Sequence, residues 1–90
     1  MDRAEREKVV DWFAEQVKAK LREPRNEDKG SWREDTLYDL LSKLKREANE
    51  LRAELRSEDE GLNYDAIISE AVDVSAFSMM IADVARILKD

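Results

Sequence analysis

The segment from Ala66 to Leu88 is almost entirely apolar, and this constrains the fold more than any other feature of the chain. Its hydrophobic side chains do not form a single stripe but cover several sides of the helix expected here. A helix that is hydrophobic all round must be buried all round. Because two companion helices of one small chain cannot readily enclose it, we expect this helix at the centre of a four-helix-bundle-like core shared between subunits. The sequence thus predicts a homodimer or a homotetramer.

The few helix-breaking residues mark where the helices end. Two glycines and one proline fall in two polar segments, residues 21–32 and 56–63. No stretch alternates polar and apolar residues with the period of a strand, so we expect three main helices. The first should span about residues 2–22 and the third should continue to about Lys89. The predicted fold class is all-α, with a helical hairpin-type subunit and a single domain over residues 1–90.

Capping patterns indicate where the second and third helices begin. Residues 31–34 have the S-x-x-E form of a capping box, which predicts that the second helix begins within residues 32–36. A similar pattern at residues 57–60 indicates a short turn before the second glycine. Asn63 or Asp65 can cap the third helix, because either side chain accepts hydrogen bonds from free backbone N–H groups.

The composition excludes several classes of function. The chain has no cysteine and no histidine, which removes thiolate and imidazole metal sites, cysteine nucleophiles and Ser-His triads. Any metal must therefore be held by oxygen, which favours Mg²⁺, with Mn²⁺ as a substitute, over Zn²⁺. The net charge of −6 argues against nucleic acid as a partner, since phosphate binding needs a concentrated basic face.

The sequence also bears on location. The first residues lack the apolar core of a signal peptide and any lipidation motif. The longest apolar stretch carries three acids and one arginine, so we expect no membrane span. A cytoplasmic location is the default expectation.

Two pairs of acids have the spacing of neighbours on a helix surface. Glu70 and Asp73 lie inside the apolar segment, and Glu47 and Glu50 lie in the preceding helical segment. Residues i and i+3 point roughly the same way, so each pair shares one side of its helix. A buried carboxylate without a partner is costly and normally finds a cation or changes its protonation state.

Helical geometry predicts that the two pairs meet. At 100° per residue from Leu44, Glu47 falls at about −60° and Glu50 at about −120°, on one flank of the leucine stripe. Counted from Ile67, the two acids of the third helix fall at about the same two angles. If these helices pack antiparallel, we expect the four carboxylates to converge at one edge of their interface.

Such a cluster could be a metal site, or the acids could have only a structural role. Hard divalent cations relieve the repulsion between carboxylates, and Mg²⁺ takes substrate phosphates as further ligands. Lys29, Lys43, Arg46 or Arg86 can supply further positive charge to those phosphates. The alternative for the first acid pair is a solvated helix flank, and for the second it is structural pairing with arginine or lysine.

The arrangement resembles the MazG-like nucleoside triphosphate pyrophosphohydrolases of the all-α NTP pyrophosphatase superfamily. Their signature, ExxE on one helix and ExxD on the next, is matched here by residues 47–50 and 70–73, with 19 residues between them. The resemblance covers about residues 10–87. Within the family, the sequence is similar to the short, phage-associated branch linked to dATP and dGTP hydrolysis. Three blocks carry it: KGSW (29–32), LLSKLKREANEL (40–51) and EAVDVSAFSMMIAD (70–83).

The resemblance implies hydrolysis of a (deoxy)nucleoside triphosphate to the monophosphate and pyrophosphate. It implies that the Mg²⁺ ligands are the four acids of the two motifs, with a glutamate of the first motif or a water relay orienting the attacking water. It also implies a phosphate or base contact at Lys29 and Trp32, and a dimer or a dimer of dimers. The candidate metal ligands are Glu47, Glu50, Glu70 and Asp73, the candidate catalytic residues are Glu47 and Glu50, and the candidate substrate contacts are Lys29, Trp32, Lys43 and Arg46.

The chain departs from the family pattern at two positions. Arg46 precedes Glu47 where many relatives have a second glutamate, and Ala76 stands where many have an asparagine shortly after the aspartate. Two other functions stay open beside the enzyme: a non-enzymatic helical oligomerisation or interaction module that keeps the fold, and a protein that binds nucleotide phosphates without hydrolysing them.

Overall fold

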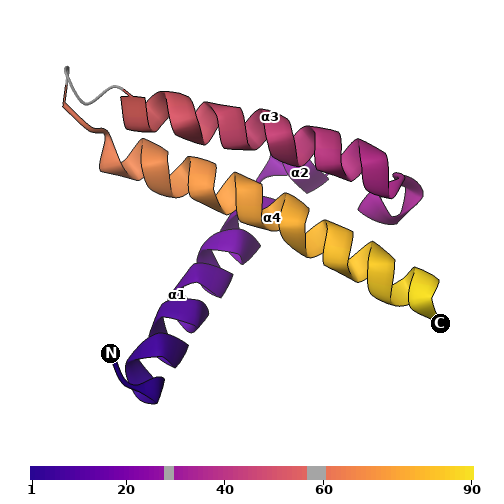
Figure 1. The fold of residues 1–90 in the computed structure, drawn as a ribbon, viewed down its shortest axis with the longest axis horizontal. Helices are drawn as coiled ribbons and strands as arrows, with labels where there is room; N and C mark the ends of the chain where they lie inside the picture. Colours follow the sequence, from indigo (N-terminus) through magenta and orange to yellow (C-terminus); the bar gives the residue numbers. More distant parts are fainter. Residues whose placement is uncertain (28–29, 57–60) are drawn as a thin grey trace. The chain divides into compact units, whose positions relative to one another are not determined.

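The computed structural model describes residues 1–27, 30–56 and 61–90, and all regular structure in these ranges is helical. The chain forms two compact units, Met1–Gly30 and Ser31–Asp90, which are considered one at a time. Figure 1 shows their elements. The elements are α1 (Arg3–Leu21), α2 (Pro24–Glu27), the 3-10 helix η1 (Trp32–Glu34), α3 (Leu37–Leu55) and α4 (Tyr64–Lys89). The predicted all-α class is confirmed.

In the first unit, α1 begins and ends within a residue of its predicted bounds. Asp2 caps it by accepting a hydrogen bond from the backbone N–H of Glu5 at 2.8 Å. The polar segment after α1, predicted only to separate two helices, contains the short helix α2. Pro24 is the first residue of α2, where its fixed φ and missing N–H are tolerated. The Asn26 side chain donates to the backbone carbonyl of Lys20 at 2.7 Å and ties the two helices together.

The second unit begins with a turn that the capping patterns only partly predict. Ser31 accepts a hydrogen bond from the backbone N–H of Arg33, but the helix that it caps is the short η1. Asp35 is extended (φ −81°, ψ 151°), so η1 does not run on into α3. Thr36 is the cap of α3 and accepts from the backbone N–H of Asp39 at 3.1 Å. The second long helix therefore begins one residue after the predicted range, because a second capping residue follows the first.

The start of α4 agrees with one of the two predicted caps. The Asn63 side chain accepts a hydrogen bond from the backbone N–H of Ala66 at 3.1 Å, and α4 ends at Lys89 as predicted. The capping pattern at 57–60 lies outside the described residues.

The second unit is an antiparallel hairpin of α3 and α4, which lie side by side over most of their lengths (Figure 1). Its core is small and consists of one α3 residue and one face of α4. The fully or nearly buried hydrophobic residues are Leu40, Val72, Ala76, Met80 and Val84. Other apolar residues of α4, such as Val74, Phe77 and Ile81, are half-buried, while Ile68, Met79, Ile87 and Leu88 are exposed.

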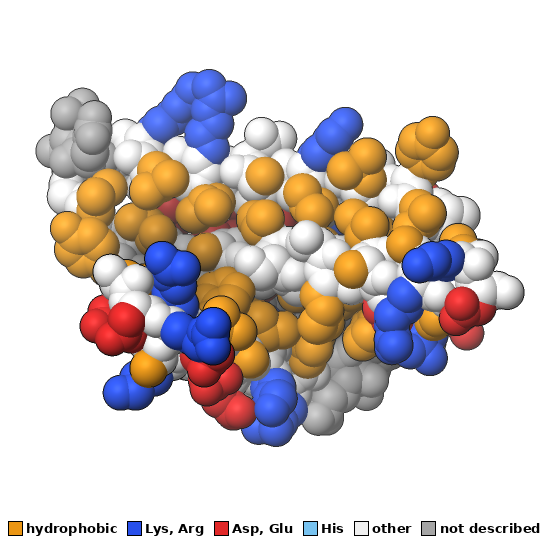
Figure 2. Space-filling view, turned by 60° about the horizontal axis from the view of Figure 1, so that its bottom comes forward, with side chains coloured by type: hydrophobic (Ala, Val, Ile, Leu, Met, Phe, Trp, Pro, Cys, Tyr) orange, Lys and Arg blue, Asp and Glu red, His pale blue; other side chains and the backbone are white. Residues whose placement is uncertain are grey.

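Many large hydrophobic side chains are exposed, and Figure 2 shows such side chains spread over one face of the molecule. On the hairpin, Ile68, Ile87 and Leu55 are 37%, 45% and 49% exposed. Among the described residues, no helix has a run long and apolar enough to cross a membrane.

Candidate metal centre

Three of the four predicted ligand carboxylates lie together in the middle of the hairpin. Glu47 of α3 and Glu70 and Asp73 of α4 each offer an oxygen atom, and these atoms lie within 4.8 Å of one another. All three side chains are half-buried at the interface between the two helices. Their closeness follows from the two flank positions read from the sequence, combined with antiparallel packing.

Glu50 occupies the exposed edge of this acid cluster, which we define as Glu47, Glu70 and Asp73. Its carboxylate lies close enough to that of Glu47 to raise the pKa of Glu47, but it does not join the three converging oxygens. The difference follows from the helical angle. Glu50 lies about 60° farther round α3 from the leucine stripe than Glu47 does, and is therefore turned toward solvent.

The other acids of the cluster make ionisation of Glu47 unfavourable. Burial, together with a hydrogen bond that the protonated Glu47 carboxyl donates to Glu50 and the negative charges of Glu50, Asp73 and Glu70, raises the pKa of Glu47 to about 7. Only 12% of the Glu47 side chain is exposed. Its Oε2 atom is buried and has no hydrogen-bond partner among the described residues. An oxygen in this position fits a divalent cation, which would relieve both the desolvation and the repulsion.

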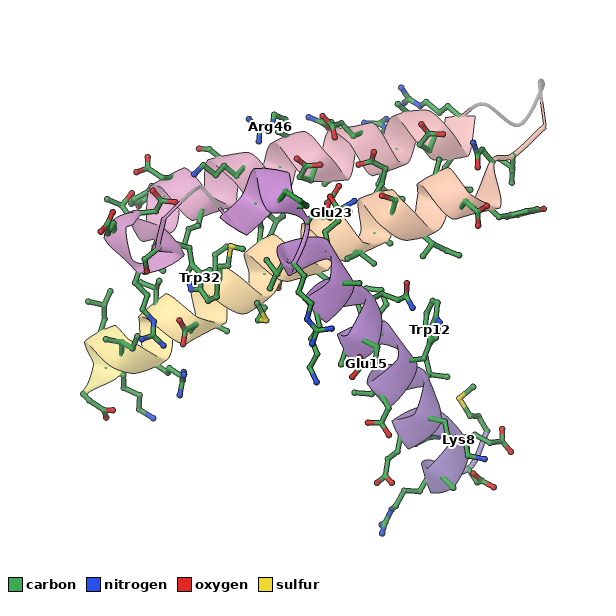
Figure 3. All side chains as sticks on the ribbon, turned by 180° about the vertical axis from the view of Figure 1, so that it is seen from behind. Lys8, Trp12, Glu15, Glu23, Trp32 and Arg46 are labelled. Atoms are coloured by element: carbon green, nitrogen blue, oxygen red, sulfur yellow. The ribbon has the colours of Figure 1, made fainter. Side chains whose placement is uncertain are left out.

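Two of the predicted phosphate contacts lie near the hairpin surface. The Nη2 atom of Arg46 is 3.7 Å from Glu47 Oε1, and Figure 3 shows the Arg46 side chain pointing away from α4. Lys43 donates to the carboxylate of Asp35 at 3.0 Å and is 42% exposed. Lys29 lies outside the described residues. The sequence thus places one cation directly beside the cluster and a second one a helical turn earlier.

Trp32 takes a different place from the one expected for a substrate contact at the acid cluster. Its indole N–H donates to Oδ2 of Asp83 at 2.9 Å. Figure 3 shows its ring between η1 and α4. Since Asp83 follows Asp73 by ten positions, the two lie about 15 Å apart along the axis of α4. The structure therefore does not bring Trp32 to the acid cluster of its own chain.

Asp83 is the centre of a hydrogen-bonded group that the sequence did not reveal. Arg33 donates from Nε to Oδ2 at 2.9 Å and from Nη2 to Oδ1 at 3.1 Å. Arg86 donates from Nε and Nη2 to Oδ1 at 2.9 Å and 2.7 Å. These bonds, with that of Trp32, hold the pKa of Asp83 well below its usual range, and the same carboxylate raises the pKa of Arg33. The sequence could have indicated the pair of Asp83 and Arg86, because an aspartate in an apolar helix has an arginine at i+3. It could not indicate the contact with Arg33, which lies 50 residues away and depends on the fold.

The chain was compared with known proteins in three ways. Models of protein families, curated proteins and solved structures all yield no match.

Proposed function

We propose that the protein is a Mg²⁺-dependent nucleoside triphosphate pyrophosphohydrolase of the MazG-like type, which converts a (deoxy)nucleoside triphosphate, such as a purine dNTP, into the monophosphate and pyrophosphate. The observation that supports it most is the convergence of Glu47, Glu70 and Asp73, with a buried Glu47 oxygen that makes no hydrogen bond among the described residues. These residues belong to the two motifs on which the family resemblance rests.

In this proposal, different residues of the hairpin bind the cation and accept the proton. Glu47, Glu70 and Asp73 would hold Mg²⁺, or Mn²⁺ in its place, through oxygens suited to hard cations. When bound, the cation neutralises phosphate charge and lowers the pKa of a coordinated water. Glu50, whose carboxylate lies beside that of Glu47 at the exposed edge, is placed to accept a proton from the attacking water and to orient it.

The cations of α3 complete the proposed site. The Arg46 guanidinium lies beside Glu47 and is 64% exposed, so it can turn toward a phosphate without a large desolvation cost. Lys43 can exchange its bond with Asp35 for one to a phosphate oxygen. Ala76, at the position where many relatives have asparagine, is a buried core residue of the hairpin and offers no polar contact.

Pyrophosphate release tests this function directly. We expect release from at least one of the common dNTPs or NTPs in the presence of Mg²⁺, and none with EDTA. Thermal unfolding with and without Mg²⁺ gives an independent reading, since a cation that binds the folded state raises its stability. Absence of release from every nucleotide, together with absence of stabilisation by Mg²⁺, would exclude the enzyme.

We further propose that the hairpin assembles with a second copy into a four-helix-bundle-like core. The small buried core and the exposed Ile68, Ile87 and Leu55 support this, because burial of such side chains is the main source of stability in helical bundles. The same exposed surface favours the second candidate function, a helical interaction module. That protein would assemble in the same way but release no pyrophosphate.

Sedimentation analysis tests the assembly. We expect a dimer or tetramer of the 10.5 kDa chain. Ile68→Asp should weaken association by about tenfold or more, because an interface would bury an unpaired carboxylate. Ser78→Asp adds the same charge at an exposed position of α4 and serves as the control. A wild-type protein that stays monomeric at every concentration, or equal effects of the two variants, would contradict the proposed interface.

A further inference from the structure

We propose that the cavity between η1 and α4 is a second ligand site, which binds a small aromatic anion. Its volume is about 420 Å³, within the range of about 300–1,000 Å³ typical of small-molecule sites. It is lined by Trp32, Arg33, Met79, Ala82, Asp83 and Arg86. The acid cluster contributes no residue to it, so the proposal does not depend on the proposed hydrolysis.

The lining of this cavity offers a surface for a flat ring. Trp32, Met79 and Ala82 supply its apolar part. Aromatic rings and thioether groups both interact favourably with aromatic ligands. The hydrogen bond from the Trp32 indole N–H to Asp83 fixes the ring of Trp32, so little side-chain entropy remains to be lost when a ligand stacks on it.

The charges around the cavity favour an acidic group on that ring. Two guanidinium groups face one carboxylate, which leaves a local excess of one positive charge in a chain whose net charge is −6. Arg33 and Arg86 each donate one N–H of Nε and one of Nη2 to Asp83, which leaves both N–H groups of Nη1 and the second one of Nη2 for a ligand. Their side chains are 55% and 72% exposed, which makes these donors accessible. Guanidinium groups bind carboxylate and phosphate oxygens with particular strength.

The position of the cavity on α4 separates it from the acid cluster. Measured round the helix from Asp73, Glu70 lies at about +60°, whereas Met79 and Arg86 lie at about −120° and −140°. The buried face of α4 lies between these two directions. The cavity and the acid cluster therefore occupy opposite flanks of the helix, and a ligand in one does not displace a ligand in the other.

Fluorescence of Trp32 tests the proposal, with dAMP as the probe because it joins a flat ring to a phosphate. The chain has two tryptophans, so Trp12→Phe leaves Trp32 as the reporter. Titrations are done in EDTA, which prevents metal-dependent binding at the acid cluster. We expect a saturable change with dAMP and a much weaker response to adenosine or to orthophosphate alone.

Variants in the same background locate the binding. Arg33→Gln and Arg86→Gln should each weaken dAMP binding by about tenfold, since each removes a charge-assisted hydrogen bond. Arg52→Gln, at an exposed position of α3, is the matched control and should leave binding unchanged. Ala82→Phe fills the cavity without removing any partner of Asp83 and should abolish the response even if the arginine variants unfold. Overturning results would be no saturable change, equal binding of adenosine or orthophosphate, or binding that survives Ala82→Phe.

Discussion

Glu47→Gln is expected to reduce Mg²⁺-dependent pyrophosphate release by at least about 100-fold. Losing a hydrogen-bonding partner outside the ligand shell typically costs 10- to 100-fold in metal affinity or activity, so losing a ligand should cost more. Glu47 is the residue through which α3 enters the acid cluster, so no other side chain of the cluster can replace it from that helix. Steady-state rates at several Mg²⁺ concentrations measure the loss and show whether it lies in metal binding.

Three further variants sharpen this result. Glu54→Gln removes a half-buried acid from the same flank of α3 outside the acid cluster and should keep most of the activity. Asp73→Asn and Glu50→Gln should abolish turnover while leaving helicity largely intact. Activity retained in both Glu47→Gln and Asp73→Asn would show that the reaction takes place elsewhere on the molecule.

The same Glu47→Gln substitution should stabilise the metal-free protein at pH 8. The folded protein holds the Glu47 proton up to a pKa of about 7, whereas the ordinary value is 4.5. The folded state therefore binds more protons than the unfolded state between these values, and its stability falls as the pH rises through this window. Each pH unit in the window costs up to about 1.4 kcal/mol, so the total is on the order of 3 kcal/mol. Glutamine stays neutral and avoids this loss.

Urea unfolding in EDTA at pH 4 and pH 8 measures the effect. The wild-type protein should lose stability between the two values, while Glu47→Gln should lose less and be the more stable protein at pH 8. Saturating Mg²⁺ at pH 8 should stabilise the wild-type protein and have little effect on the variant. A variant that is less stable than the wild-type protein at pH 8 in EDTA would contradict the charge repulsion assigned to Glu47. If both results are obtained, Glu47 lowers the stability of the metal-free protein at pH 8 and is required for metal binding.

Most of the helical structure could be predicted from the sequence because it depends on local signals. Asp2 and Asn63 cap the helices predicted to follow them, and both helices end where the apolar pattern stops. The start of α3 lies one residue beyond the predicted range because two capping residues follow each other there. Ser31 caps the short η1 and Thr36 caps α3, and the extended Asp35 between them separates the two helices.

The candidate site was predictable to the extent that helical angles determine it. The flank positions of Glu47, Glu70 and Asp73 are properties of single helices, and antiparallel packing brings them together. The bonds of Asp83 were not predictable in this way. Arg33 and Trp32 reach Asp83 from a different segment, and the arrangement depends on how η1 folds back on α4.

The acid cluster also bears on which hairpin forms. Since α4 is apolar on several sides, it offers more than one face against which the leucines of α3 can pack. A shift of one residue along α4 would move the contact by about 1.5 Å and turn it by about 100°, which would carry Glu70 and Asp73 away from Glu47. Only the pairing that joins the three carboxylates would gain the free energy of cation binding. A bound cation would thus stabilise one register over the competing helix pairings. Its removal would increase the population of the other registers.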